Sequence, residues 1–322
     1  MSDKSQQDFA AFYTTRPFCP ENGTYRAENE HFILKVNADG LILLCLKSDY
    51  LRELYLVNKC KNTEKMEYKW SYYTTFLNAL YLLLDCYTLK DLQLAYFDIS
   101  EVTTKDIMVV TLDENESIQG ISYQYGDQIA RYASTNNSLK ISENILNRVS
   151  ITLEQCCLDC DRLHMLADLG KGLSEYKILS FSTSLILLWF VIERFVTSIW
   201  NRYLEEQNKT FDRDIKRINS DRKSQLTRYL DIHKTLNFLE LTETLDFSKF
   251  EVLNELRDVR NKIAHRNNKF ICKKEHCLKA FDMIKYFIET EYEIDLIFNT
   301  RYLLMGIYDR SSNNPRKADS ER

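Results

Sequence analysis

The first 135 residues combine short apolar runs with one long apolar segment of helical spacing. Residues 32–36 and 41–46 are two such runs, and the Asp39-Gly40 pair between them is a strong hairpin signal. The other apolar runs predict helices near 49–60 and at 68–87, and strands at 92–99, 107–112 and 118–123. This mixture predicts a small α+β domain over residues 1–135, in which no residue pattern indicates catalysis.

From residue 136 onward the apolar positions follow helical spacing. The polar stretch 134–138 marks the boundary, and the polar end at 309–322 is expected to be disordered. Between them the pattern predicts a helix at 139–167 that is broken by Gly170-Lys171-Gly172, a long apolar helix at 178–206, short surface helices at 212–231, a helix at 255–266 and one more helix after it. The chain is therefore expected to be mostly α, with a helical domain at 136–308.

The predicted helix at 255–266 has two chemically different sides. Its apolar side is a stripe of residues three or four positions apart, namely Val252, Leu256, Val259 and Ile263. Arg257, Asn261 and His265 follow one another along the opposite side, one turn apart, and Arg260 lies at the flank of the stripe. Two guanidinium groups, an amide and an imidazole on one helix are well suited to bind a phosphate.

Arg260 and His265 do not point in the same direction on an ideal helix. A helix turns about 100° per residue, so positions five apart diverge by about 140°. The two side chains can share one phosphate in three ways: through the reach of the arginine, through a loosened last turn, or across the axis of a dimer.

The run Arg260-Asn261-Lys262-Ile263-Ala264-His265 resembles the R-x4-H signature of HEPN-domain ribonucleases, including the polar residue after the arginine. The family's domain is a small helical bundle, and its signature lies near the end of the third main helix. The predicted helices of this chain match that arrangement over roughly 175–300, somewhat under half of its length. The resemblance therefore implies an all-α HEPN bundle after the α+β domain.

The resemblance implies cleavage of RNA by its own 2′-OH, without a metal or a cofactor, leaving a 2′,3′-cyclic phosphate and a 5′-OH. Histidine titrates near neutral pH, so His265 would exchange the proton. Arg260 would hold the phosphate and stabilise its extra charge, and Asn261 would orient the imidazole or a phosphate oxygen. Family members pair two signatures in a shared cleft, so a homodimer is expected. Nearby basic residues would add RNA contacts: Arg257, Lys262, Arg266 and Lys269.

Two further features of the family bear on regulation. Some members are toxins in which a tyrosine two residues after the histidine is modified, but Asn267 stands there in this chain. Members with an extra N-terminal domain resemble anti-phage abortive-infection proteins such as the ApeA-like group, so residues 1–135 would sense a phage-derived or protein trigger. Two alternatives stay open: a non-catalytic HEPN-like dimer that binds RNA, a nucleotide or a protein, and a helical scaffold with a chance motif.

Charge and composition limit the nucleic-acid surface and the compartment. The chain has 43 Lys and Arg against 47 Asp and Glu, so any RNA-binding field must be local. Residues 255–285 carry nine basic against four acidic residues, either as such a field or as a solvated helix face. The start of the chain lacks a secretory pattern, and the longest uncharged run of the apolar helix, residues 178–192, is too short to span a membrane. With nine cysteines that lack framework spacing, these features predict a cytoplasmic protein.

Two smaller features stay open at the level of sequence. Cys156, Cys157, Cys160 and His164 approach a zinc spacing, but a continuous helix is a poor frame for it, and a fourth ligand would have to come from Cys156 or from distant residues. The default expectation is free thiols and no metal. Glu193 interrupts the apolar surface of the long helix, and either receives an arginine from the helix 255–266 or faces water beside Arg194.

Overall fold

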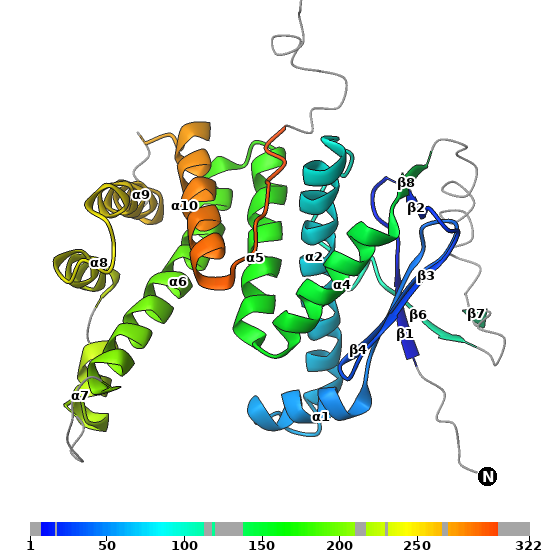
Figure 1. Ribbon diagram of the computed structural model, residues 1–322, viewed down its shortest axis with the longest axis horizontal. Coiled ribbons are helices and arrows are strands. Elements are labelled where there is room, and N and C mark those ends of the chain that lie inside the picture. The colour runs from blue at the N-terminus through cyan, green and yellow to red at the C-terminus, as the bar shows by residue number, and fades with distance from the viewer. Residues whose placement is uncertain are drawn as a thin grey trace, which may run out of the picture.

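The computed structural model describes residues 8–16, 18–112, 118–119, 138–209, 217–228, 231–265 and 270–301. Its elements are, in order, β1 (Asp8–Phe12), β2 (Phe18–Pro20), β3 (Tyr25–Glu28), β4 (Phe32–Val36), β5 (Ile42–Leu46), α1 (Ser48–Val57), α2 (Lys65–Leu92), β6 (Met108–Leu112), β7 (Ile118–Gln119), β8 (Leu139–Ile141), α4 (Glu143–Cys157), α5 (Cys160–Lys177), α6 (Phe181–Lys209), α7 (Ser220–Arg228), α8 (Ile232–Leu241), α9 (Phe247–Ala264) and α10 (Lys274–Tyr292). The sheet lies at one end of the molecule and the later helices at the other (Figure 1). The predicted α+β N-terminal part and helical C-terminal part are thereby confirmed.

An antiparallel sheet with the strand order β3-β4-β5-β1-β6-β7 forms the N-terminal layer, and β2 pairs in parallel with β8. The predicted hairpin joins β4 to β5, with Phe32 opposite Leu46 and Val36 opposite Ile42. Gly40 in its turn has a φ of 85°, and a Cβ there would lie 2.0 Å from the carbonyl oxygen of Phe18. Glycine is therefore required at this turn both by its conformation and by its surroundings.

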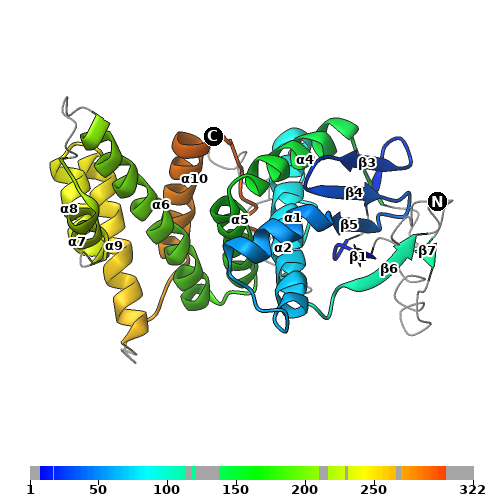
Figure 2. The same ribbon diagram turned by 90° about the horizontal axis from the view of Figure 1, so that it is seen from below.

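One continuous apolar core connects the sheet to the helical part. It includes Phe32 of β4, Phe76 of α2, Leu173 of α5 and Leu256 of α9. Seen from below, the layers follow one another from the sheet through α2 and α5 to α6 and α10, and then to α7, α8 and α9 (Figure 2). The core thus crosses the predicted boundary at residue 135. That boundary and the predicted tail at 309–322 lie outside the described residues and stay predictions.

The prediction of a single helix over 139–167 was wrong. Residues 139–141 form β8, and α4 and α5 are separate helices with a break at Leu158 and Asp159. Asp159 caps the second helix, because its carboxylate accepts a hydrogen bond from the Asp161 backbone N–H at 3.1 Å. The apolar periodicity continues through the break, because both helices bury their apolar sides in the same core.

Gly170 and Gly172 do not break the helix; they are contact points inside α5. A Cβ at position 170 would lie 3.3 Å from the carbonyl oxygen of Asn78 in α2. A Cβ at position 172 would lie 2.9 Å from Cδ2 of Leu188 in α6, whose side chain is fully buried. The two glycines therefore allow α5 to approach both neighbouring helices closely.

Replacing Gly172 by alanine is expected to destabilise the protein by about 1–3 kcal/mol, because the added methyl group overpacks the core against Leu188. This loss should exceed the gain of about 1 kcal/mol in helix propensity. Urea unfolding measures the difference, with Gly170→Ala as the matched variant of smaller expected effect. A Gly172→Ala protein more stable than the wild type would show that the α5–α6 contact is looser than described.

The predicted strand at 92–99 was also wrong. Helix α2 continues to Leu92, and the following residues pair in neither of the two described sheets. Phe97 and Ile99 are buried, and the Phe97 ring packs edge-on against Phe18 and Tyr81. Apolar residues alternate here because one side of this connecting segment is buried. The same alternation occurs in paired strands, so sequence alone cannot distinguish the two cases.

Helix α6 is the one described helix that is long and apolar enough to cross a membrane by length and composition alone. Half of its most apolar stretch is buried inside the structure, against α5, α9 and α10. The buried half belongs to the core that α6 shares with these helices.

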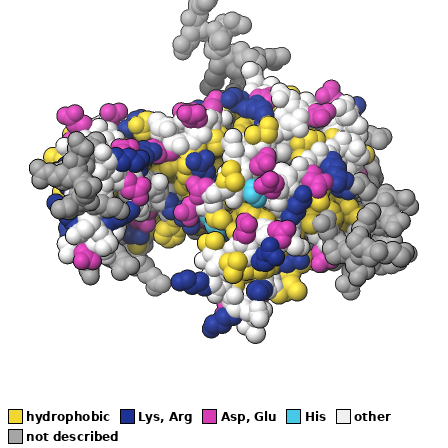
Figure 3. Space-filling view, turned by 60° about the horizontal axis from the view of Figure 1, so that its bottom comes forward, with side chains coloured by type: hydrophobic (Ala, Val, Ile, Leu, Met, Phe, Trp, Pro, Cys, Tyr) yellow, Lys and Arg dark blue, Asp and Glu magenta, His cyan; other side chains and the backbone are white. Residues whose placement is uncertain are grey.

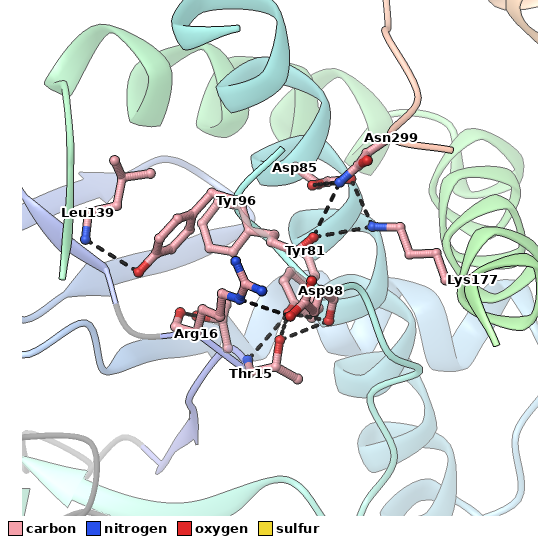
Figure 4. A network of polar contacts seen from close by, with 11 residues as sticks. Thr15, Arg16, Tyr81, Asp85, Tyr96, Asp98, Leu139, Lys177 and Asn299 are labelled. Atoms are coloured by element: carbon pink, nitrogen blue, oxygen red, sulfur yellow. Dashed lines mark hydrogen bonds and ion pairs between the residues drawn. The ribbon is translucent and has the colours of Figure 1, made fainter. Parts of the chain in front are cut away.

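A buried polar network fastens the connection after α2 to the helices around it (Figure 4). Nζ of Lys177, at the end of α5, lies 3.7 Å from Oδ2 of Asp85 in α2, and both side chains are 1% exposed. The ammonium also donates to the Phe97 carbonyl at 3.2 Å, and Asn299 donates to the other Asp85 oxygen at 3.4 Å. The network therefore joins α2, α5, the connection after α2 and the segment that follows α10.

Candidate functional site

The candidate site lies on α9, a helix that packs against α6, α8 and α10. Leu253, Leu256 and Val259 are buried, with Val252 and Ile263 half-buried beside them. The predicted apolar stripe is therefore confirmed, with Leu253 added to it. This packing fixes the rotation of α9 and decides which of its polar side chains face outward.

Arg260 is anchored by a carboxylate from α6. Its guanidinium lies 4.0 Å from Oε1 of Glu193 and donates to Oδ1 of Asn261 at 3.1 Å. The same Glu193 oxygen accepts the indole N–H of Trp189 at 2.5 Å. Of the two alternatives for Glu193, the structure shows the pairing with the signature helix. Arg260 keeps 31% of its side chain exposed, so an anion can still reach it.

His265 stands at the C-terminal cap of α9 with an exposed side chain. Its backbone N–H donates to the Asn261 carbonyl at 2.9 Å, so the last turn keeps its helical hydrogen bond. Within the described part of the chain, no hydrogen bond or ion pair reaches the imidazole. A loosened turn therefore does not bring His265 to Arg260, which leaves the reach of the arginine or a second copy of the chain.

A second histidine lies on the same side of the site and was missed by sequence reasoning. His233, in the first turn of α8, contacts a guanidinium nitrogen of Arg257 through Nδ1, which also receives the Asn237 amide at 3.1 Å. Arginine only donates, so Nδ1 accepts and the ring proton is assigned to Nε2. Arg257 is further held by Asp258 at 2.8 Å. The contact arises from the packing of α8 on α9, for which sequence spacing offers no signal.

The predicted basic field is only partly available to a ligand. Lys262 lies over the Phe270 ring at 5.6 Å, and Lys279 is paired with Glu255 at 2.6 Å. Arg266 and Lys269 lie outside the described residues. On the face shown in Figure 3, basic and acidic side chains are intermingled. The described residues on this face therefore do not form a continuous basic surface.

The cysteines tested for a zinc site are divided between two places. Cys156 and Cys157 are buried at the end of α4, and burial raises the pKa of each thiol to about 12. Cys156 packs beside the C-terminal end of α10, whereas Cys272 and Cys277 lie at its start, where both thiols donate to the Phe181 carbonyl. No group of three or more potential metal ligands occurs in the described ranges.

The arrangement on α9 combines an anchored guanidinium, an adjacent amide and an exposed imidazole. Such groups can bind a phosphate, stabilise added negative charge on it and exchange a proton with a neighbouring hydroxyl. Asn261 links the first two functions to the third, because its side chain contacts Arg260 and its carbonyl accepts the His265 N–H. No family model, curated protein or solved structure matches this chain.

Proposed function

We propose that this protein is a metal-independent endoribonuclease of the HEPN type. The proposal rests on one observation: the R-x4-H residues lie in the last turns of α9 within reach of a ligand, with His265 exposed and Arg260 31% exposed beside Glu193 and Asn261. A carboxylate on another helix favours the orientation of the nearby guanidinium, which then loses less conformational freedom when it binds a phosphate. The exposed His265 supplies an imidazole that can exchange a proton, a group that a site for anion binding alone does not need.

The proposed reaction needs one proton removed and one delivered. The 2′-OH of a ribose loses its proton to an imidazole and attacks the adjacent phosphorus atom, and the bond to the 5′-oxygen breaks. A second group returns a proton to that oxygen, so the products are a 2′,3′-cyclic phosphate and a 5′-OH. Arg260 stabilises the extra negative charge on the phosphate oxygens during the transfer.

A homodimer fits this chemistry better than a single chain. One protomer has one His265, and its imidazole diverges from the Arg260 side chain by about 140° along the helix. A second copy would supply a second imidazole for the returning proton and a second guanidinium facing the first. The oligomeric state is measured by sedimentation or light scattering, and a monomer that cleaves RNA would refute this part of the proposal.

The biological setting that we propose is anti-phage defence or toxicity in the cytoplasm, because an unregulated RNase would damage its own cell. The N-terminal sheet would receive the trigger, from phage or from another protein. Helix α2 supports this role, since it lies between the sheet and α5 and shares one core with both. Removal of residues 1–135 would expose the α2-facing side of α5, so regulation is best tested on the full-length chain.

The function is tested by incubating the full-length protein with labelled single-stranded RNA in EDTA. We expect cleavage with 2′,3′-cyclic phosphate ends, and none at positions where the attacking ribose is replaced by deoxyribose. Cleavage that proceeds through the deoxy position would contradict 2′-OH attack. A dimer that binds the RNA without cutting it, with or without a cellular extract to supply a trigger, would favour the non-catalytic binding alternative.

A further inference from the structure

A cavity of about 250 Å³ lies directly beside the Arg260 anchor, between α6, α7 and α8. The described residues that line it are Glu193, Thr197 and Trp200 of α6, Thr227 of α7, and Ile232 and Thr235 of α8. Figure 2 shows these three helices side by side at the end of the molecule away from the sheet. A concave site with apolar walls and a few converging polar groups is the usual form of a small-ligand site.

Two hydroxyl groups of the cavity wall, those of Thr227 and Thr235, donate their protons to backbone carbonyls of their own helices or helix caps. Oγ1 of Thr227 donates to the Lys223 carbonyl at 2.9 Å, and Oγ1 of Thr235 donates to the Asp231 carbonyl at 3.2 Å. A hydroxyl oxygen that has donated its proton still has lone pairs to accept hydrogen bonds. While these bonds are kept, both threonines offer a ligand in the cavity an acceptor and not a donor.

The other polar groups of the wall reinforce this pattern. The carboxylate of Glu193 accepts only, and the Trp200 indole N–H is taken by the Leu226 carbonyl at 2.8 Å. Thr197 is exposed at the rim, and its hydroxyl can rotate to donate or accept. The interior thus presents several acceptors and an apolar surface from Trp200 and Ile232. Such a wall favours a ligand that brings hydrogen-bond donors.

We propose that this cavity binds a guanine base of the RNA substrate. The Watson–Crick edge of guanine carries two adjacent donors, N1–H and N2–H, which match a carboxylate and neighbouring acceptor oxygens. Adenine and cytosine place a ring-nitrogen acceptor beside their amino group, and uracil places its single N–H between two carbonyls. An acceptor-lined wall repels these edges, so discrimination comes from rejection as well as from attraction.

The position of the cavity connects it to the proposed reaction. Glu193 forms part of its wall and lies 4.0 Å from Arg260, so a base in the cavity and a phosphate on Arg260 would belong to one short stretch of RNA. Sequence-specific RNA recognition generally captures unstacked bases in this way. The inference rests on the proposed function for the source of the base, and it names guanine as the specificity element.

The inference is tested by calorimetric titration of the full-length protein with guanosine, inosine, adenosine, cytidine and uridine 5′-monophosphates. We expect guanosine monophosphate to bind at least about tenfold more tightly than inosine monophosphate, which lacks the N2 amino group, and to surpass the other three by more. Thr235→Val removes an acceptor, and Ile232→Trp fills the cavity, so each should weaken guanosine monophosphate binding by about tenfold or more. Glu193 is kept unchanged because it also contacts Arg260.

The matched control is Thr290→Val, because Thr290 makes the same backbone bond on α10, to the Tyr286 carbonyl at 2.9 Å, and is exposed. This variant should bind as the wild type does, and thermal unfolding shows whether each variant is folded. Equal binding of the five nucleotides, absence of binding at millimolar concentration, or binding that survives Ile232→Trp would overturn the inference. Because the titration needs no cleavage, an RNase without guanine binding refutes only the cavity, and guanine binding without RNase activity refutes only the proposed function.

Discussion

Replacement of His265 by alanine is expected to lower the rate of RNA cleavage by about 10²–10⁴-fold, the usual contribution of a positioned acid–base group. The imidazole is exposed, and no described residue bonds to it, so its loss should leave the stability of the protein unchanged. Cleavage of the labelled RNA in EDTA measures the effect, and urea unfolding verifies the fold. The control is His31→Ala, which removes an imidazole from the turn between β3 and β4.

Arg260→Ala should lower the same rate by about 10²–10³-fold, because it removes the group proposed to stabilise the added charge. Arg260→Lys should restore little of this loss, since an ammonium cannot make the paired hydrogen bonds of a guanidinium. Arg52→Ala on α1 is the control, because it removes an exposed arginine whose one ion pair among the described residues is with Asp49. Activity that survives both His265→Ala and Arg260→Ala would mean that the cleavage arises elsewhere or from a contaminant.

The parts of the fold that sequence predicted correctly are those determined by local chemistry. The Asp39-Gly40 turn is one, because the positive φ of Gly40 is a property of that residue. The apolar stripe of α9 is another, because a helix of 18 residues must bury a continuous side. Errors occurred where apolar spacing has more than one structural cause. Phe97 looks like part of a strand because it is buried, and Gly172 looks like a helix breaker although it serves a helix contact.

In the candidate site, too, sequence predicted the features that depend on local chemistry and missed those that depend on tertiary packing. Sequence placed Arg260, Asn261 and His265 on one helix, and a carboxylate interrupting the apolar side of α6 indicated that Glu193 needed a partner. The contact between His233 and Arg257, and the cavity beside Glu193, depend on how α7 and α8 fold back onto α6 and α9. The packing of these helices on one another is a tertiary property, which local sequence preference does not predict.

Lys177→Met is expected to destabilise the protein by about 3–5 kcal/mol, because it leaves the buried Asp85 carboxylate without its counter-charge. The double variant Asp85→Leu/Lys177→Met should recover most of that loss, since it removes both buried charges. Lys171→Met is the matched control on the same helix: it breaks the exposed pair with Glu101, which is expected to contribute about 0–1 kcal/mol. Urea unfolding measures all three variants. Equal losses for Lys171→Met and Lys177→Met would refute a special role for the buried pair.

The same pair predicts how stability depends on pH. Burial raises the pKa of Asp85 to about 6 from its ordinary value of 3.8, despite the attraction of Lys177. Between these values the folded state holds the proton that the unfolded state has released, so this group lowers the free energy of unfolding as pH rises from about 4 to 6. Surface carboxylates such as Glu28, whose pKa is lowered by its hydrogen bond to Arg26, act in the opposite direction.

The pH dependence is therefore best measured as a difference between the wild type and the Asp85→Leu/Lys177→Met variant, in which the surface carboxylates are the same. The wild type should lose stability relative to the double variant by about 2–3 kcal/mol on going from pH 4 to pH 7. A difference that stays constant over this range would show that Asp85 releases its proton as readily in the folded protein as in the unfolded chain.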